Sequence, residues 1–121
     1  MTKRILVVDD DEMVRFALSE LLKPEGYDVD ATGSPKDALS KIDKENYDLL
    51  MLDIIMPELD GLALCEEIRR RETYKEVPIV FLTAKNREKD RQQGLEVGAN
   101  RFLSKPISPE KLLEIISETL G

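Results

Sequence analysis

The 121-residue sequence has one cysteine, no histidine and no long hydrophobic segment, and these scarcities exclude several protein classes. Cys65 cannot form an internal disulfide, which fits a reducing compartment. No apolar run approaches the roughly 20 residues of a membrane span. Residues 1–4 lead straight into a predicted strand rather than a signal peptide. We therefore expect a cytoplasmic protein with no membrane partner.

A clustered positive charge is also missing. The net charge is −7, and the only block of cations, residues 69–71, falls where a helix is predicted to end. A surface that binds the phosphate backbone of nucleic acid is expected to carry a basic patch. Direct binding to nucleic acid is therefore not expected.

What the chain does contain is a series of apolar runs separated by amphipathic segments. The composition is 41% hydrophobic and 36% charged, as in a globular domain, and we expect residues 1–121 to form one domain. Buried strands are predicted at residues 5–8, 49–52 and 78–82, an alternating edge strand at 27–31, and a short last strand at 101–104.

Helical spacing of apolar residues predicts five helices between and after these strands. The third is expected at about residues 61–71, capped by Asp60. The fourth, at residues 85–97, has only Leu95 and Val97 to anchor it, so it should be the least firmly held. Alternating strands and helices predict an α/β fold, a flavodoxin-like doubly wound parallel sheet with strand order 2-1-3-4-5.

Four of the five predicted strands end on chemically useful side chains. Asp9 and Asp10 follow the first strand, Asp53 the third, Thr83 the fourth and Lys105 the fifth. In this fold the carboxyl ends of the strands meet at one crevice. Crowded carboxylates repel one another unless a cation joins them, and hard oxygen ligands suit Mg²⁺. With an ammonium and a hydroxyl, the set suits a site that positions and neutralises a transferred phosphoryl group.

In these segments the sequence resembles the receiver domain of two-component response regulators, of the chemotaxis or sporulation single-domain type. The resemblance covers the whole chain and rests on five motifs in order: residues 7–10, residues 52–57 with 60–61, residues 82–84, residues 98–99 and residues 105–106. Each motif is weak alone, and together they are specific. Whether the chain is a whole regulator or part of a longer one stays open.

The resemblance implies a phosphoacceptor and a metal site. Asp53 would accept the phosphoryl group, and the cofactor would be Mg²⁺ with no other cofactor. Asp10 would bind the metal directly, together with Asp53 and the backbone carbonyl of Ile55. Asp9 would take part through water. Asp11, next to the acidic pair, is expected to cap the first helix.

The resemblance also assigns a phosphoryl contact and a switch. Thr83 and Lys105 would contact the phosphoryl group, and the Lys105–Pro106 peptide bond is expected to be cis. Thr83 would move toward the phosphoryl group, and Phe102 would swing into the space that it leaves. The surface of the fourth helix and last strand would then change and carry the signal.

Some residues depart from the usual pattern of this family. Phe102 lacks the hydroxyl of the more usual tyrosine, so the switch would act by packing alone. Ile55 and Lys85 occupy the two positions that tune access of water to the acyl phosphate, and Ile55 is expected to slow hydrolysis. DNA-binding members of the family that dimerise through the fourth and fifth helices commonly have an acidic pair where this chain has Asn100 and Arg101. This difference favours a monomer.

The residues bear on three other interpretations. A haloacid-dehalogenase-type phosphatase needs a second carboxylate two residues beyond its nucleophile, where this chain has Ile55. A flavin module of the same fold would have its phosphate repelled by residues 9–11. A binding module that works without phosphorylation is the remaining alternative, although no phosphorylation residue is missing. We expect no enzyme, only self-phosphorylation and slow autodephosphorylation.

The absence of histidine has one more consequence under this interpretation. The phosphoryl group must come from the phosphohistidine of another protein or from a small acyl phosphate. The expected partners are a histidine kinase or histidine phosphotransfer protein, and a downstream effector protein or domain.

Overall fold

The computed structural model describes residues 2–121 and contains a five-stranded parallel sheet in the order β2-β1-β3-β4-β5. The strands are β1 (Arg4–Val8), β2 (Asp28–Thr32), β3 (Leu49–Leu52), β4 (Ile79–Thr83) and β5 (Arg101–Ser104). Both the parallel sheet and the strand order confirm the predicted flavodoxin-like fold.

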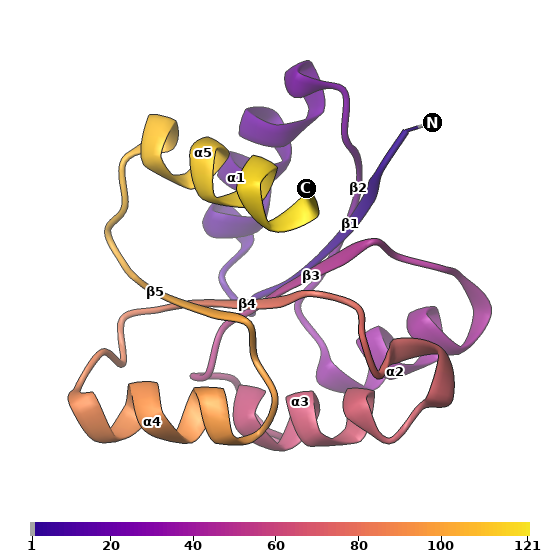
Figure 1. Ribbon diagram of the computed structural model, residues 1–121, viewed down its shortest axis with the longest axis vertical. Coiled ribbons are helices and arrows are strands. Elements are labelled where there is room, and N and C mark those ends of the chain that lie inside the picture. The colour runs from indigo at the N-terminus through magenta and orange to yellow at the C-terminus, as the bar shows by residue number, and fades with distance from the viewer. Residues whose placement is uncertain (1) are drawn as a thin grey trace.

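Helices cover both faces of this sheet. α1 and α5 lie on one face and α2, α3 and α4 on the other (Figure 1). Their bounds are α1 (Glu12–Leu22), α2 (Pro35–Lys44), α3 (Gly61–Arg69), α4 (Glu88–Glu96) and α5 (Pro109–Leu120), and two short 3-10 turns lie at Lys23–Glu25 and Glu72–Tyr74. Within residues 2–121 no helix is long and apolar enough to span a bilayer.

Side-chain caps explain where four of the five helices begin. Asp11 accepts a hydrogen bond from the N–H of Met13 and so starts α1, as predicted. Ser34, Asp60 and Ser108 accept bonds from backbone N–H groups in the first turns of α2, α3 and α5. These helices therefore begin at fixed points just after the loops that follow the strands.

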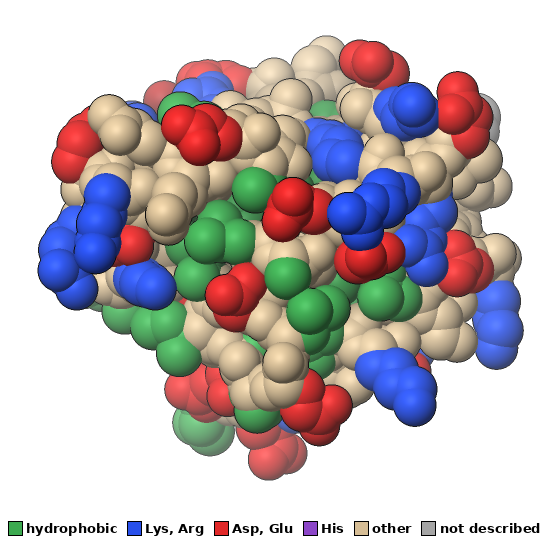
Figure 2. Space-filling view, turned by 90° about the horizontal axis from the view of Figure 1, so that it is seen from below, with side chains coloured by type: hydrophobic (Ala, Val, Ile, Leu, Met, Phe, Trp, Pro, Cys, Tyr) green, Lys and Arg blue, Asp and Glu red, His purple; other side chains and the backbone are tan. Residues whose placement is uncertain are grey.

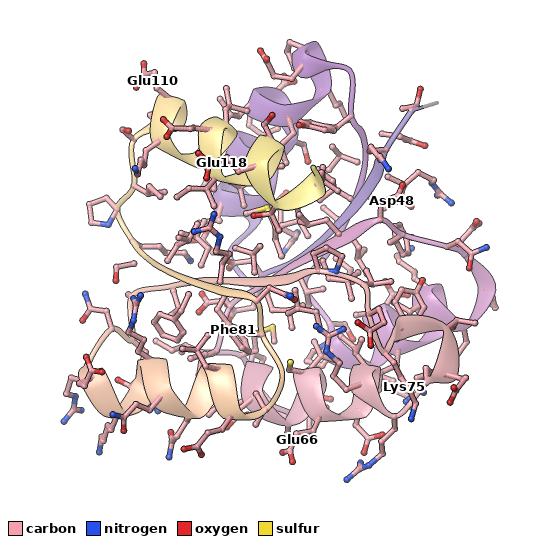
Figure 3. The ribbon with its side chains drawn as sticks, viewed as in Figure 1. Asp48, Glu66, Lys75, Phe81, Glu110 and Glu118 are labelled. Carbon is pink, nitrogen blue, oxygen red and sulfur yellow. The ribbon has the colours of Figure 1, made fainter. Side chains whose placement is uncertain are left out.

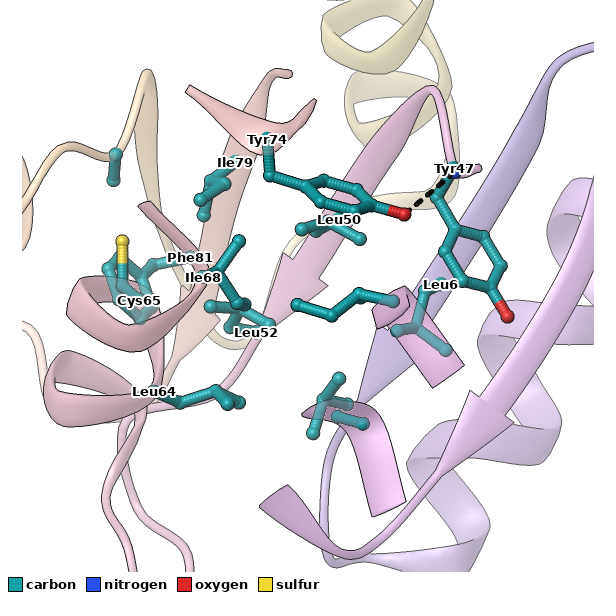
Figure 4. Packing of buried hydrophobic residues seen from close by; sticks show 14 of the residues in the cluster. Leu6, Tyr47, Leu50, Leu52, Leu64, Cys65, Ile68, Tyr74, Ile79 and Phe81 are labelled. Atoms are coloured by element: carbon teal, nitrogen blue, oxygen red, sulfur yellow. Dashed lines mark hydrogen bonds between the residues drawn. The ribbon is translucent and has the colours of Figure 1, made fainter. Parts of the chain in front are cut away.

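The core has two layers, one on each side of the sheet. Alternate residues of a strand face opposite layers, so Ile5 packs with α1 and α5 while Leu6 packs with α2 and α3. The layer on the α2 and α3 side includes two tyrosines that the sequence did not predict (Figure 4). The N–H of Tyr47 donates to the hydroxyl of Tyr74 across 3.2 Å, which satisfies both groups in the interior.

α4 differs from the prediction in length and in orientation. It begins at Glu88 rather than residue 85, and Leu95, predicted to anchor it, is 45% exposed. Asp90 and Gly94, one turn apart, are the buried residues of the helix. A Cβ on Gly94 would lie 2.8 Å from the ring of Phe102, so the small residue must face the sheet, and Leu95 then faces solvent.

Apolar side chains do not form one continuous surface on the face covered by α2, α3 and α4. Small hydrophobic patches lie among acidic and basic side chains there (Figure 2). The large apolar residues of β4 are instead buried, and Phe81 lies between the sheet and the layer of α3 and α4 (Figure 3).

Candidate functional site

The ends of β1, β3 and the loop after β5 meet around one ammonium group. Lys105 Nζ donates to Asp9 Oδ2 at 2.8 Å and to Asp53 Oδ2 at 2.9 Å. Both carboxylates are nearly buried, with relative exposures of 3% and 6%. The structure thus brings together three of the residues predicted from the strand ends.

Backbone N–H groups hold the second oxygen of each carboxylate. Asp9 Oδ1 accepts from the N–H of Asp11 at 2.9 Å, and Asp53 Oδ1 accepts from the N–H of Ile55 at 3.1 Å. The N–H of Asp53 donates to the carbonyl of Val8 at 3.1 Å, which aligns the two strand ends. Both carboxylates are therefore fixed before any ligand arrives.

Burial and hydrogen bonding act against each other on the pKa values of Lys105 and Asp9, and both values are raised. Burial lowers the pKa of Lys105, but its hydrogen bonds to Asp9 and Asp53 outweigh that effect and raise the pKa above its ordinary value. Burial raises the pKa of Asp9 despite its bonds from Lys105 and Asp11. Lys105 is therefore cationic at neutral pH, and the buried charge on Asp9 is only partly compensated.

Thr83 lies at the end of β4 and is fully buried. Its Oγ1 accepts from the N–H of Lys85 at 3.2 Å, and its carbonyl accepts from the N–H of Lys105 at 2.9 Å. The Lys105–Pro106 peptide bond is cis, as predicted. Thr83 is thus joined through the backbone to Lys105, which contacts Asp53.

The predicted metal ligands are only partly gathered. The side chain of Asp10 is exposed, and within residues 2–121 no three carboxylate or thiol side chains converge as a metal cluster. The donor chemistry still fits a hard divalent cation, because Asp9 is a buried carboxylate with incomplete charge compensation. The roles of Asp10 and the Ile55 carbonyl as ligands stay predictions.

Two residues that support the site have roles not predicted from the sequence. Gly61, at the start of α3, lies so close to the end of β3 that a Cβ there would be 2.0 Å from the carbonyl oxygen of Asp53. Arg15 Nη1 donates to the carbonyl of Asp9 at 2.8 Å and so ties α1 to the end of β1. The motif at residues 60–61 pointed to Gly61, whereas no local pattern marks Arg15.

Phe102 is buried in this structure, with 5% exposure. Its ring centroid lies 6.0 Å from that of Phe81 at an interplanar angle of 50°. The sequence predicts that the Phe102 ring swings inward when Thr83 moves. In this structure the ring already lies in the interior, against Gly94 of α4. A role for Phe102 as a switch stays a prediction.

Comparisons with known proteins agree with this geometry. Residues 5–117 match the family model described as the response regulator receiver domain. The chain is 41% identical to the alkaline phosphatase synthesis transcriptional regulatory protein PhoP of Bacillus subtilis. The match extends over 112 residues, which are 93% of this chain and 46% of that protein. The chain therefore spans just under half the length of this relative.

Solved structures show the same fold along nearly the whole chain. The chemotaxis protein CheY4 of Vibrio cholerae superposes with a TM-score of 0.94 at 32% identity, over 98% of this chain and 99% of that one. The DrrB receiver domain, whose structure is described as BeF3-activated, gives a TM-score of 0.90 at 31% identity, over 99% of this chain and 98% of that one.

Proposed function

Because the chain belongs to the response regulator receiver family, we propose that Asp53 accepts a phosphoryl group from the phosphohistidine of a partner protein. The observation that carries this proposal is the pair of hydrogen bonds from Lys105 to Asp9 and Asp53. They present a fixed carboxylate beside a cation, which is what an in-line attack on phosphorus requires.

The chain's own residues divide the reaction between them. An oxygen of Asp53 forms the new P–O bond while the P–N bond of the donor breaks and its electron pair returns to the imidazole. Lys105 neutralises negative charge on the phosphoryl oxygens, and the Thr83 hydroxyl, which accepts from the N–H of Lys85, donates its own proton to one of them. The nucleophile is the Asp53 carboxylate itself, so the transfer needs no general base.

Mg²⁺ is the proposed cofactor. Asp9, Asp10, Asp53 and the carbonyl of Ile55 would hold it, and bound Mg²⁺ neutralises phosphoryl charge during transfer. Asp10, exposed at the end of β1, is free to turn toward an ion. A cation there would also relieve the incompletely compensated charge of Asp9.

The phosphodonor is proposed to dock on α1 beside the site. A groove of about 630 Å³ between α1 and the loop before α5 is lined by apolar side chains and reaches Lys105. Two large hydrophobic residues on α1 are also exposed, Met13 at 74% and Phe16 at 63%. A histidine-bearing helix of a kinase or phosphotransfer protein, with an apolar face, fits a surface so close to Asp53.

The proposed output surface is α4 with β5. α4 buries only Asp90 and Gly94 and leaves Leu95 exposed, so few apolar contacts oppose its displacement. The free energies of α4 in its positions before and after phosphorylation should differ by only a few kcal/mol, and the contacts of one phosphoryl group can supply that difference. An effector protein or domain would read the change. The chain is proposed to act as a monomer and to turn over no free substrate.

Labelling with acetyl phosphate and Mg²⁺ tests the proposal. Wild-type protein should take up one phosphoryl group, Asp53→Asn none, and Asp10→Ala much less because it binds metal weakly. Glu58→Gln, which removes an exposed charge from the loop after β3, is the matched control and should label normally. Undiminished labelling of Asp53→Asn would refute the assignment of Asp53, whereas a wild-type protein that takes up no label would favour a module that binds without phosphorylation.

A further inference from the structure

Asp90 is a buried acidic residue outside the phosphorylation site. It belongs to the first turn of α4 and is 1% exposed. Its Oδ2 accepts from the N–H of Arg87 at 3.0 Å, the residue before the helix. Arg87 is not one of the residue types that usually cap helices, so the α4 N-terminus relies on Asp90 to satisfy this N–H.

The same carboxylate also faces the loop that leads from the site. Asp90 Oδ1 lies 4.0 Å from Lys85 Nζ, and the N–H of Lys85 donates to Thr83 Oγ1 at 3.2 Å. Contacts therefore run without interruption from Thr83 through Lys85 and Asp90 to Arg87. The last two members fix the first turn of α4 to the loop at residues 84–87.

Asp90 is the buried side chain in the first turn of α4. Glu88 and Lys89 are exposed, and the other buried position, Gly94, lies a full turn further along. Without the bond from the Arg87 N–H to Asp90, only the Arg87 carbonyl, which accepts from the N–H groups of Asp90 and Arg91 at 3.0 Å each, would join the loop to the first turn, and a shift of the loop would fray that turn more easily. With that bond, loop and helix must move together.

We propose that Asp90 is a positioning residue that couples Thr83 to α4, so that the helix is displaced whenever Thr83 turns toward the phosphoryl group. This inference rests on the proposed function and adds the residue that transmits it. Coupling is reciprocal, so a helix that resists displacement must weaken the binding of a phosphoryl mimic at Asp53. Cutting the link should therefore tighten that binding.

Two pairs of variants cut the link from opposite sides. Arg87→Pro removes the donor N–H, and proline suits this position because the φ of Arg87 is −72°. Arg87→Ala removes the same side chain but keeps the N–H. Asp90→Ala removes the acceptor, whereas Asp90→Asn keeps an oxygen that accepts from Arg87. Each disruptive variant thus has a matched partner.

The experiment titrates beryllofluoride with Mg²⁺ into each protein by calorimetry and follows amide exchange of residues 88–96. Arg87→Pro and Asp90→Ala should bind beryllofluoride about fivefold more tightly or better than wild type. They should also lose the exchange response of α4. Arg87→Ala should keep wild-type affinity and response. Asp90→Asn keeps the acceptor for the Arg87 N–H but loses the charge that faces Lys85, so it should fall between wild type and Asp90→Ala.

A purely structural Asp90 would give a different result. Amide protection of α4 would then fall equally with and without beryllofluoride, and the affinity for beryllofluoride would stay unchanged or weaken. Either result, seen in both Arg87→Pro and Asp90→Ala, would overturn the coupling. If Asp90→Ala melts far below wild type, the comparison of Arg87→Pro with Arg87→Ala decides alone. Failure of wild type to bind beryllofluoride would instead remove the proposed function, and this inference with it.

Discussion

Gly94→Ala tests whether α4 owes its position to close contact with the Phe102 ring. The new Cβ would lie 2.8 Å from Cδ2 of Phe102 and 3.3 Å from Cδ2 of Phe81, whereas carbon atoms in contact are about 3.5–4.0 Å apart. Overpacking costs about 1–3 kcal/mol, and replacing glycine by alanine inside a helix gains about 1 kcal/mol. Urea unfolding should therefore show a net loss of roughly 1 kcal/mol.

The Phe102→Ala background provides the decisive control. Without the ring the main clash disappears, so Gly94→Ala should now stabilise the protein by about 1 kcal/mol through helix propensity alone. The substitution is thus expected to change sign between the two backgrounds. Equal effects in both would show that the two residues are not coupled and would refute this account of how α4 is packed.

Three further substitutions test the site and the core. Gly61→Ala, whose Cβ would lie 2.0 Å from the carbonyl oxygen of Asp53, should abolish acetyl phosphate labelling and lower the urea midpoint; a normal label would contradict the proposed close approach. Lys105→Met leaves the carboxylates of Asp53 and Asp9 without their shared cation, so thermal melts without Mg²⁺ should show a loss of about 3 kcal/mol of stability. Added Mg²⁺ should stabilise this variant more than it stabilises wild type. Burial raises the pKa of Cys65 to about 11 from 9.0, so the folded state keeps the thiol proton longer and stability should fall as pH rises from about 9 to 11; Cys65→Ala should lack this part of the fall.

The fold was predictable because its signals are local. Uninterrupted apolar runs marked the buried strands, and the predicted cap Asp60 marked where α3 begins. Asp11 was correctly assigned as the cap of α1 rather than a member of the acidic pair. Each of these inferences depends on residues within one turn or one strand of each other.

The features that were missed depend on distant partners. Tyr74 lies in the core, where its hydroxyl accepts from the N–H of Tyr47 and donates to the carbonyl of Glu45, both from another part of the chain. Arg69, placed by its sequence neighbours at a helix end, donates to the carbonyls of Tyr74, Val77 and Gly98 and so ties α3 to two loops. No local periodicity carries such information.

The orientation of α4 shows the same limit in a different form. Hydrophobicity pointed to Leu95 as an anchor, but the helix packs on Gly94 because the Phe102 ring needs that space. At the site, the strand ends located Asp9, Asp53, Thr83 and Lys105. They did not reveal that Lys105 bonds to both carboxylates, which requires the tertiary structure.

The central claim is that Asp53 is the residue phosphorylated, and peptide mass spectrometry after treatment with acetyl phosphate and Mg²⁺ tests it most directly. Wild-type protein should carry one phosphoryl group per chain, on the peptide that contains Asp53, and none when Mg²⁺ is removed with a chelator. A phosphoryl group found on a peptide without Asp53, or no modification of the folded protein at all, would contradict it.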